Sequence, residues 1–163
     1  VPGRMGILST DDHNVIAVAD FAHNRLSFEQ LALSMQKSYP DYKIVSVFGA
    51  PGGKALGRRE ELGSVGGQYS DFVILTMDDP AFERVEEISN EIAQYVEKEN
   101  TPYLIIDDRE EAIREAFNHV DGQTIILIIG KGHEKVMHIK GEKVPMSSDF
   151  ELIQKYIEDY NHN

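Results

Sequence analysis

Short runs of aliphatic and β-branched residues alternate with longer amphipathic stretches along the whole chain. The apolar runs predict strands at residues 15–20, 43–49, 71–77, 103–107 and 124–130. The run at 124–130 is the most apolar and is expected to lie near the middle of a sheet. Because strands alternate with helices, the sequence predicts an α/β domain with a mostly parallel sheet.

The segments between these strands have the pattern of helices. Residues 84–100 repeat apolar positions at helical spacing, and a last helix is expected at 148–160. Ser27 with Gln30 has the spacing of a capping box, so a helix is expected to begin at Ser27, and Asp108 is expected to open another. With an edge strand or hairpin at residues 135–146, the result is a Rossmann-like, doubly wound sheet of about six strands with helices on both faces.

Composition narrows the function classes. The chain has 163 residues, 41% of them hydrophobic, which is enough for one domain with its own core. It has no cysteine, which excludes disulfides and thiolate sites and fits a reducing, cytoplasmic setting. No apolar run has the length of a membrane span, so no membrane is expected as a partner. The net charge of −12 argues against binding of nucleic acid.

Two common nucleotide motifs are missing from the sequence. The first strand is not followed by a G-x-G-x-x-G turn, which argues against hydride transfer. No G-x-x-x-x-G-K-[ST] phosphate loop occurs, so a triphosphate would have to be held elsewhere. The histidines lack the spacing of metal ligands, and no bound metal is expected.

Glycine and charge gather where four predicted strands end, at residues 20–23, 49–59, 78–81 and 130–134. Parallel strands of one sheet finish along the same rim, and right-handed crossovers keep these ends together. Ligands of doubly wound folds bind outside that rim. The sequence therefore predicts a binding site built from these four loops.

The first two strand ends suit a nucleotide or an anion. Asp20 could accept hydrogen bonds from ribose hydroxyls, and His23 could lie beside a base. The glycine-rich loop at 49–57, with Lys54, could surround a carboxylate or phosphate with amides and cations. Structural alternatives stay open here: an aspartate that caps the next turn, and a flexible surface loop.

The other two strand ends suit a cation. Asp78 and Asp79 are adjacent carboxylates at a strand end, although aspartate and proline also favour a simple turn. Gly130 allows close approach of the backbone, and Glu134 offers a carboxylate beside it. The structural alternative is a glycine-rich turn with solvated charges.

Six motifs in this order resemble the C-terminal domain of the Mur ligases. They are VPGR at 1–4, DFAHN at 20–24, VFG at 47–49 before the basic loop, TMDDP at 76–80, DREEAI at 108–113 and GKGHE at 130–134. The resemblance is greatest to the branch that adds the third residue of the peptidoglycan stem peptide. It implies that residues 1–5 are an interdomain hinge remnant and that 6–163 form the amino-acid-binding domain. The N-terminal and central domains, with the phosphate loop and the Mg²⁺ sites, would lie outside this sequence.

The resemblance also implies roles for individual residues. Arg4 matches a hinge arginine that reaches ATP, Asp20 an aspartate on the ribose, and His23 a histidine near the nucleotide. The incoming amino acid would be surrounded by six positions: Lys54, Asp78, Asp79, Ala81, Gly130 and Glu134.

Ala81 stands where diaminopimelate-adding relatives have an arginine that would pair with the second carboxylate of that substrate. Lysine has no such carboxylate. Asp79 and Glu134 would complement the side-chain ammonium of lysine, so L-lysine is the expected substrate.

The implied reaction is ATP-dependent, ADP-forming addition of L-lysine to UDP-MurNAc-L-Ala-D-Glu, in the cytoplasm. ATP and Mg²⁺ would be held mainly by the absent central domain, and no catalytic residue is assigned to this one, which is expected to be inactive alone. The alternatives are a diaminopimelate-adding, folylpolyglutamate or cyanophycin-type ligase, or a non-catalytic binding module.

Overall fold

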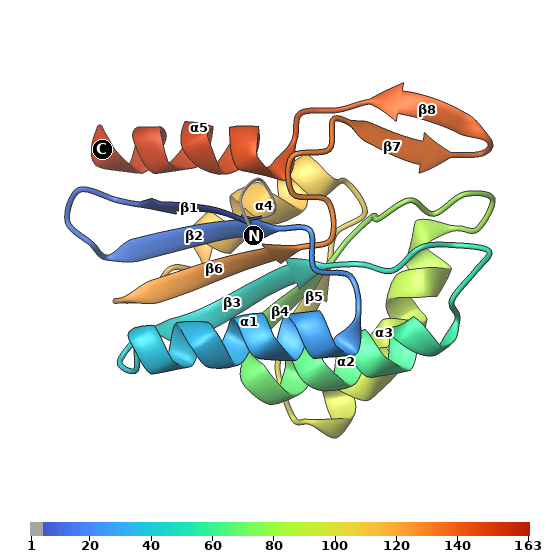
Figure 1. The fold of residues 1–163 in the computed structure, drawn as a ribbon, viewed down its shortest axis with the longest axis horizontal. Coiled ribbons are helices and arrows are strands. Elements are labelled where there is room, and N and C mark those ends of the chain that lie inside the picture. Colours follow the sequence, from blue (N-terminus) through green and yellow to red (C-terminus); the bar gives the residue numbers. More distant parts are fainter. Residues whose placement is uncertain (1–4) are drawn as a thin grey trace.

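A computed structural model describes residues 5–163 of the chain, so Arg4 lies outside the described residues. Six strands form one twisted sheet in the order β1-β2-β6-β3-β4-β5 (Figure 1). Their bounds are β1 Met5–Ser9, β2 Val15–Asp20, β3 Lys43–Phe48, β4 Phe72–Leu75, β5 Tyr103–Ile105 and β6 Thr124–Ile129. All neighbouring pairs are parallel except β1 with β2. The predicted α/β class and mostly parallel sheet are confirmed.

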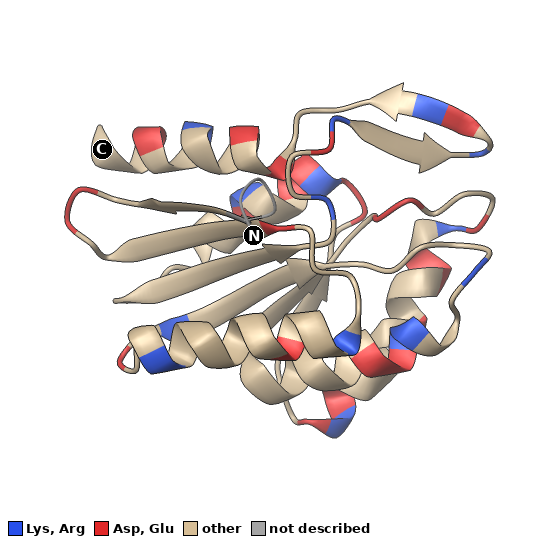
Figure 2. Cartoon of the chain, in the orientation of Figure 1, with Lys and Arg blue, Asp and Glu red and all other residues tan. Residues whose placement is uncertain are grey.

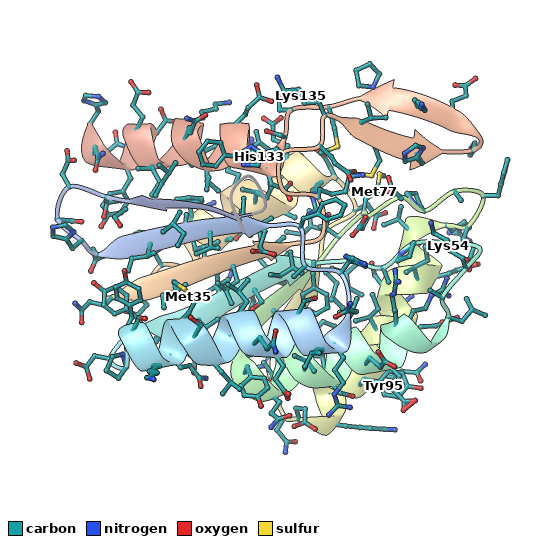
Figure 3. The ribbon with its side chains drawn as sticks, in the orientation of Figure 1. Met35, Lys54, Met77, Tyr95, His133 and Lys135 are labelled. Carbon is teal, nitrogen blue, oxygen red and sulfur yellow. The ribbon has the colours of Figure 1, made fainter. Side chains whose placement is uncertain are left out.

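Five helices cover the two faces of the sheet, and each face has its own core. The helices are α1 Arg25–Ser38, α2 Gly57–Tyr69, α3 Val85–Lys98, α4 Arg109–Asn118 and α5 Asp149–Asn161. The first three pack on one face, where Met35 of α1 points into the core (Figure 3). α4 and α5 cover the other face. None of the helices among residues 5–163 combines the length and the hydropathy of a membrane span.

The predicted central position of residues 124–130 is confirmed. β6 lies between β2 and β3, pairs in parallel with both, and is buried along its whole length. Its carboxyl end is therefore surrounded by the ends of its neighbours. Lys, Arg, Asp and Glu residues are absent from the middle of the sheet and occur on the helices and in the loops, including those that leave this end (Figure 2).

Residues 135–146, predicted as an edge strand or hairpin, form an antiparallel hairpin of β7, Val136–Ile139, and β8, Glu142–Pro145, which is separate from the six-stranded sheet. The sixth strand of the sheet is β1, whose apolar pattern is weak because one of its inward positions is Gly6. That glycine leaves room for the ring of Phe150 from α5, which fills the space a side chain would take.

The start of α1 differs from the prediction, whereas the start of α4 agrees with it. Asn24, not Ser27, caps α1: its Oδ1 accepts from Ser27 N at 2.9 Å, and Asn24 N donates to Ser27 Oγ at 3.4 Å. Ser27 thus belongs to the capping box, but at the third position of the helix and not at its N-cap. Asp108 does precede α4, but its side chain makes no capping hydrogen bond.

Glycines let α2 and α3 pack closely. At Gly63 of α2, an added Cβ would lie 2.6 Å from Ile92 O and 2.9 Å from Tyr95 Cβ of α3. The first of these atoms belongs to the backbone of a helix and cannot move aside cheaply. Gly57 begins the same helix with no atom within 4 Å of its added Cβ.

The variant Gly63→Ala should therefore be less stable than the parent protein. Overpacking of a core contact costs about 1–3 kcal/mol, which exceeds the higher helix propensity of alanine. Urea unfolding followed by circular dichroism measures the difference. Gly57→Ala is the matched control and should be neutral or slightly stabilising; equal effects of the two variants would contradict the close packing.

Candidate functional site

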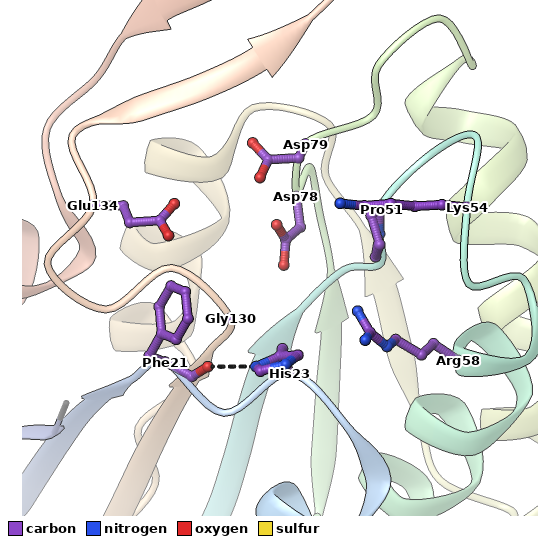
Figure 4. A pocket seen from close by; sticks show the side chains of 9 residues that line it. All are labelled: Phe21, His23, Pro51, Lys54, Arg58, Asp78, Asp79, Gly130 and Glu134. Carbon is purple, nitrogen blue, oxygen red and sulfur yellow. Dashed lines mark hydrogen bonds between the residues drawn. The ribbon is translucent and has the colours of Figure 1, made fainter. Parts of the chain in front are cut away.

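A hollow of about 330 Å³ lies at the carboxyl ends of the parallel strands (Figure 4). It is lined by loops that leave β2, β3, β4 and β6, and these are the four strand ends predicted from the sequence. The lining residues are Phe21, His23, Pro51, Lys54, Arg58, Asp78, Asp79, Gly130 and Glu134. Six of the nine residues singled out from the sequence therefore come together in one place.

Asp20 and Ala81 do not line this hollow. Asp20 Oδ1 accepts a hydrogen bond of 2.6 Å from Ala22 N, as in the structural alternative that the sequence left open. Ala81 has a φ of 54°, and its backbone pairs with the hairpin: its N donates to His138 O at 3.1 Å and its O accepts from Lys140 N at 2.8 Å. The part that Ala81 would play in an amino-acid site therefore stays a prediction.

Close backbone approach joins the loops after β3 and β4. Gly52 N donates to Asp79 O at 3.0 Å, and a Cβ at Gly52 would overlap the carbonyl of Pro80. Gly130 has a φ of 118°, and the carboxylate of Asp78 occupies the place that its side chain would need. Glycine at these two positions therefore sets how near the loops can lie.

The glycine-rich loop is anchored by a buried arginine. Arg59 of α2 contacts Glu83 Oε2 at 2.6 Å and Glu91 Oε2 at 2.8 Å, and Gly53 N donates to the same oxygen of Glu83. The loop is thus tied to the start of α3. Lys54, which belongs to the loop itself, is exposed and has no ion pair among residues 5–163.

Arg109 connects the elements below the hollow. Its Nε and Nη2 donate to the two carboxylate oxygens of Asp149, each at 2.8 Å, and it also donates to Met77 O at 2.8 Å and Ile129 O at 3.0 Å. The side chains of Arg109 and Asp149 are 4% and 0% exposed. Burial lowers the pKa of the Arg109 guanidinium, but the charge and hydrogen bonds of Asp149 raise this pKa by more, so the ion pair persists.

A second buried cation lies beside the predicted acidic residues. Lys131, with a side chain 1% exposed, places Nζ 2.9 Å from Asp79 Oδ1 and 2.7 Å from Glu134 Oε2. Burial lowers its pKa, but the hydrogen bonds to these carboxylates raise it above the ordinary value. Asp79 and Glu134, the two carboxylates expected to complement a ligand ammonium, therefore already share a lysine of this chain as a partner.

Asp78 is held differently from its neighbour. Burial raises the pKa of its carboxyl group, and the positive charges of Arg109 and Lys131 only partly offset this, so the net direction is upward. A cationic ligand beside Asp78 would favour the charged form.

Unlike charges face one another across the hollow. The carboxylates of Asp78, Asp79 and Glu134 form one side, and Lys54 and Arg58 approach from the other (Figure 4). Such an arrangement can bind a molecule that carries both an anionic and a cationic group. Within residues 5–163 no three histidine, aspartate or glutamate side chains are grouped as metal ligands.

Sequence reasoning missed Arg109, Lys131 and Asp149. Arg109 had a detectable signal, since it shares helical spacing with the buried Ala112, Ile113 and Ala116 of α4. An arginine on the apolar face of a helix requires a buried partner. Lys131 lies in the GKGHE motif at 130–134, but no spacing in the sequence indicated that its side chain is buried.

Comparisons with known proteins identify a family that the chain matches and several similar proteins. It matches the family described as Mur ligase, glutamate ligase domain, over residues 3–132. The UDP-N-acetylmuramyl-tripeptide synthetase of Ligilactobacillus salivarius (strain UCC118) is 35% identical over 159 residues, covering 98% of this chain and 31% of the relative. The UDP-N-acetylmuramoyl-L-alanyl-D-glutamate--L-lysine ligase of Streptococcus pyogenes serotype M3 (strain ATCC BAA-595 / MGAS315) is 39% identical over 159 residues, covering 96% and 32%.

A solved structure agrees with these relatives. That of a UDP-N-acetylmuramoyl-L-alanyl-D-glutamate--2,6-diaminopimelate ligase superposes with a TM-score of 0.85 at 28% identity, over 100% of this chain and 32% of that one. The chain thus spans about a third of the length of each of these proteins.

The buried pair of Arg109 and Asp149 should be worth much more than a surface pair. Arg109→Met leaves Asp149 buried without its partner, and the free energy of unfolding should fall by about 3–5 kcal/mol. Urea unfolding is the measurement, with Lys43→Met as control, because Lys43 and Asp121 form an exposed pair that should change stability little. A loss no greater than that of the control would contradict the role given to Arg109.

Proposed function

Because this chain belongs to the family described as Mur ligase, glutamate ligase domain, we propose that it is the amino-acid-binding domain of an ATP-dependent, ADP-forming amide ligase. The proposed reaction adds L-lysine to UDP-MurNAc-L-Ala-D-Glu in the cytoplasm. The chain covers about a third of its relatives, so the activity would require its N-terminal and central domains as well. The single observation that supports amino-acid binding is the hollow with carboxylates on one side and cations on the other.

The charges of the hollow match the charges of free lysine. Lys54 and Arg58 would pair with the α-carboxylate, and an arginine can do so through two parallel hydrogen bonds. Asp79 and Glu134 would accept hydrogen bonds from the ε-ammonium. The α-amine is then the one polar group of the ligand left unheld, and it is the nucleophile that the reaction requires.

Lysine, rather than diaminopimelate, is supported by two features. Ala81 offers no guanidinium to a second carboxylate, and that carboxylate would face Asp79 and Glu134 instead. The relative that is 39% identical is named an L-lysine ligase. The same argument disfavours glutamate, the substrate of a folylpolyglutamate-type ligase, because its side-chain carboxylate would meet like charge.

The domain would also complete a nucleotide site. Asp20 uses one carboxylate oxygen for Ala22 N, and its other oxygen could accept from a ribose hydroxyl. His23 lies at the edge of the hollow with Phe21, at a ring-centroid distance of 5.7 Å. Arg4 would contribute from the hinge at residues 1–5. Mg²⁺ and the triphosphate are assigned to the central domain, and the share of residues 6–163 is to orient the amine and to exclude water.

L-Lysine should bind this chain more tightly than L-norleucine, which lacks only the ε-ammonium. A charge-assisted hydrogen bond contributes about 1.5–3 kcal/mol, which corresponds to a preference of roughly tenfold to a hundredfold. Chemical-shift titration of the ¹⁵N-labelled chain measures both affinities, and meso-diaminopimelate should bind more weakly than lysine.

Asp79→Asn should abolish most of that preference while retaining the local backbone, since asparagine tolerates the φ of 45° at this position. Asp41→Asn is the control, because Asp41 precedes β3 and lies at the opposite end of the sheet. Binding of lysine and norleucine with equal affinity by the parent chain would argue against the proposed ammonium site.

The 163-residue chain alone should release no phosphate from ATP. No phosphate loop is present in its sequence, so nothing is available to position the γ-phosphate. A coupled phosphate-release assay at millimolar ATP and Mg²⁺ tests this, with the complete ligase as the positive control. Lysine-stimulated ATP hydrolysis by the chain alone would overturn the assignment to a supporting domain.

A further inference from the structure

Lys131 is the first residue after Gly130 at the end of β6, and its ammonium lies behind the carboxylates of the hollow. The side chain is 1% exposed and is not among those that line the hollow. Nζ nevertheless contacts Asp79 from the loop after β4 and Glu134 from the loop after β6. A single buried charge thus joins two loops that are more than fifty residues apart in the chain.

In each of the two carboxylates, one oxygen faces Lys131 and the other does not. Asp79 Oδ1 accepts from Lys131 Nζ and from His138 N at 2.8 Å, and Glu134 Oε2 contacts the same ammonium. Asp79 Oδ2 and Glu134 Oε1 have no hydrogen-bond partner within residues 5–163. The two side chains are 27% and 40% exposed and both point into the hollow (Figure 4).

We propose that Lys131 is a positioning residue of this site: its buried ammonium fixes Asp79 and Glu134 so that one oxygen of each faces the hollow as a receptor for a primary ammonium group. This inference rests on the proposed function, because the receptor is the one assigned above to the ε-ammonium of lysine. It assigns the specificity for that ammonium to a residue that does not touch the ligand.

Charge balance explains why such a residue is needed. Asp78, Asp79 and Glu134 lie around one hollow, and the neighbouring Arg109 is already paired with Asp149. Without a further cation, like charges would drive the carboxylates apart or force one to take up a proton.

Lys131 neutralises one of the two charges that it contacts. Lys131, Asp79 and Glu134 together carry a net charge of about −1 where they meet, and one ligand ammonium is complementary to that charge. A neutral ligand side chain gains no electrostatic interaction there, and a side-chain carboxylate is repelled.

A ligand-free measurement tests the contact itself. The side-chain ammonium of Lys131 should give a ¹⁵N signal that exchanges slowly with solvent, because the side chain is buried and two carboxylates contact the ammonium. Both Asp79→Asn and Glu134→Gln should shift this signal, whereas Lys135→Met, which removes an exposed lysine nearby, should not. A rapidly exchanging signal that neither variant shifts would overturn the inference whether or not any amino acid binds.

A ligand-binding measurement tests the positioning. Lys131→Met should reduce the preference for L-lysine over L-norleucine by about tenfold, with the affinity for norleucine unchanged, and Lys131→Arg should restore part of it. Circular dichroism reports whether each variant is folded; if Lys131→Met is not, Lys131→Arg and Glu134→Gln decide.

The opposite result is equally informative. If Lys131→Met binds lysine more tightly than the parent chain, Lys131 merely competes for the carboxylates and the inference is wrong. If the parent chain binds neither lysine nor norleucine, the proposed function fails, while the ¹⁵N measurement still decides the role of Lys131.

Discussion

The ion pair between Arg109 and Asp149 is the interaction on which the rest of the site depends. A charged guanidinium below the rim of the sheet is tolerated only because every donor that it directs inward has an acceptor. Its acceptors belong to α5 and to the ends of β4 and β6. The pair therefore sets the spacing between the two loops that supply Asp79 and Glu134, and the shape of the hollow follows from it.

Much of the fold followed from the sequence because the core strands are strongly apolar. β6 consists of six buried residues and could be placed centrally from its composition alone. β1 could not be recognised, since Gly6 removes an inward side chain and Ile7 faces outward. The hairpin of β7 and β8 was found as a hairpin, but its separation from the sheet depends on tertiary contacts that no local pattern records.

The residues that line the candidate site were largely predicted from the sequence, but the buried ion pairs that hold them in place were not. Topology alone brings four strand ends together, so the exposed residues of the hollow could be identified from their places after strands. The buried ammonium that contacts both carboxylates could not be predicted. Lys131 and Asp79 come from different loops, and only the folded structure brings them into contact. The contact of Ala81 was equally hidden, since its backbone pairs with the hairpin, which comes more than fifty residues later in the chain.

The match to the ligase family ends at residue 132, yet several groups that shape the hollow come later in the chain. Asp149 neutralises Arg109. His138 N donates a hydrogen bond to Asp79 Oδ1, and the sulfur of Met137 accepts one from Asp79 N. A boundary drawn where the family match ends would therefore keep most of the residues that line the hollow and remove the residues that hold them in place. Any attempt to transplant this pocket into another protein would have to carry the last thirty residues with it.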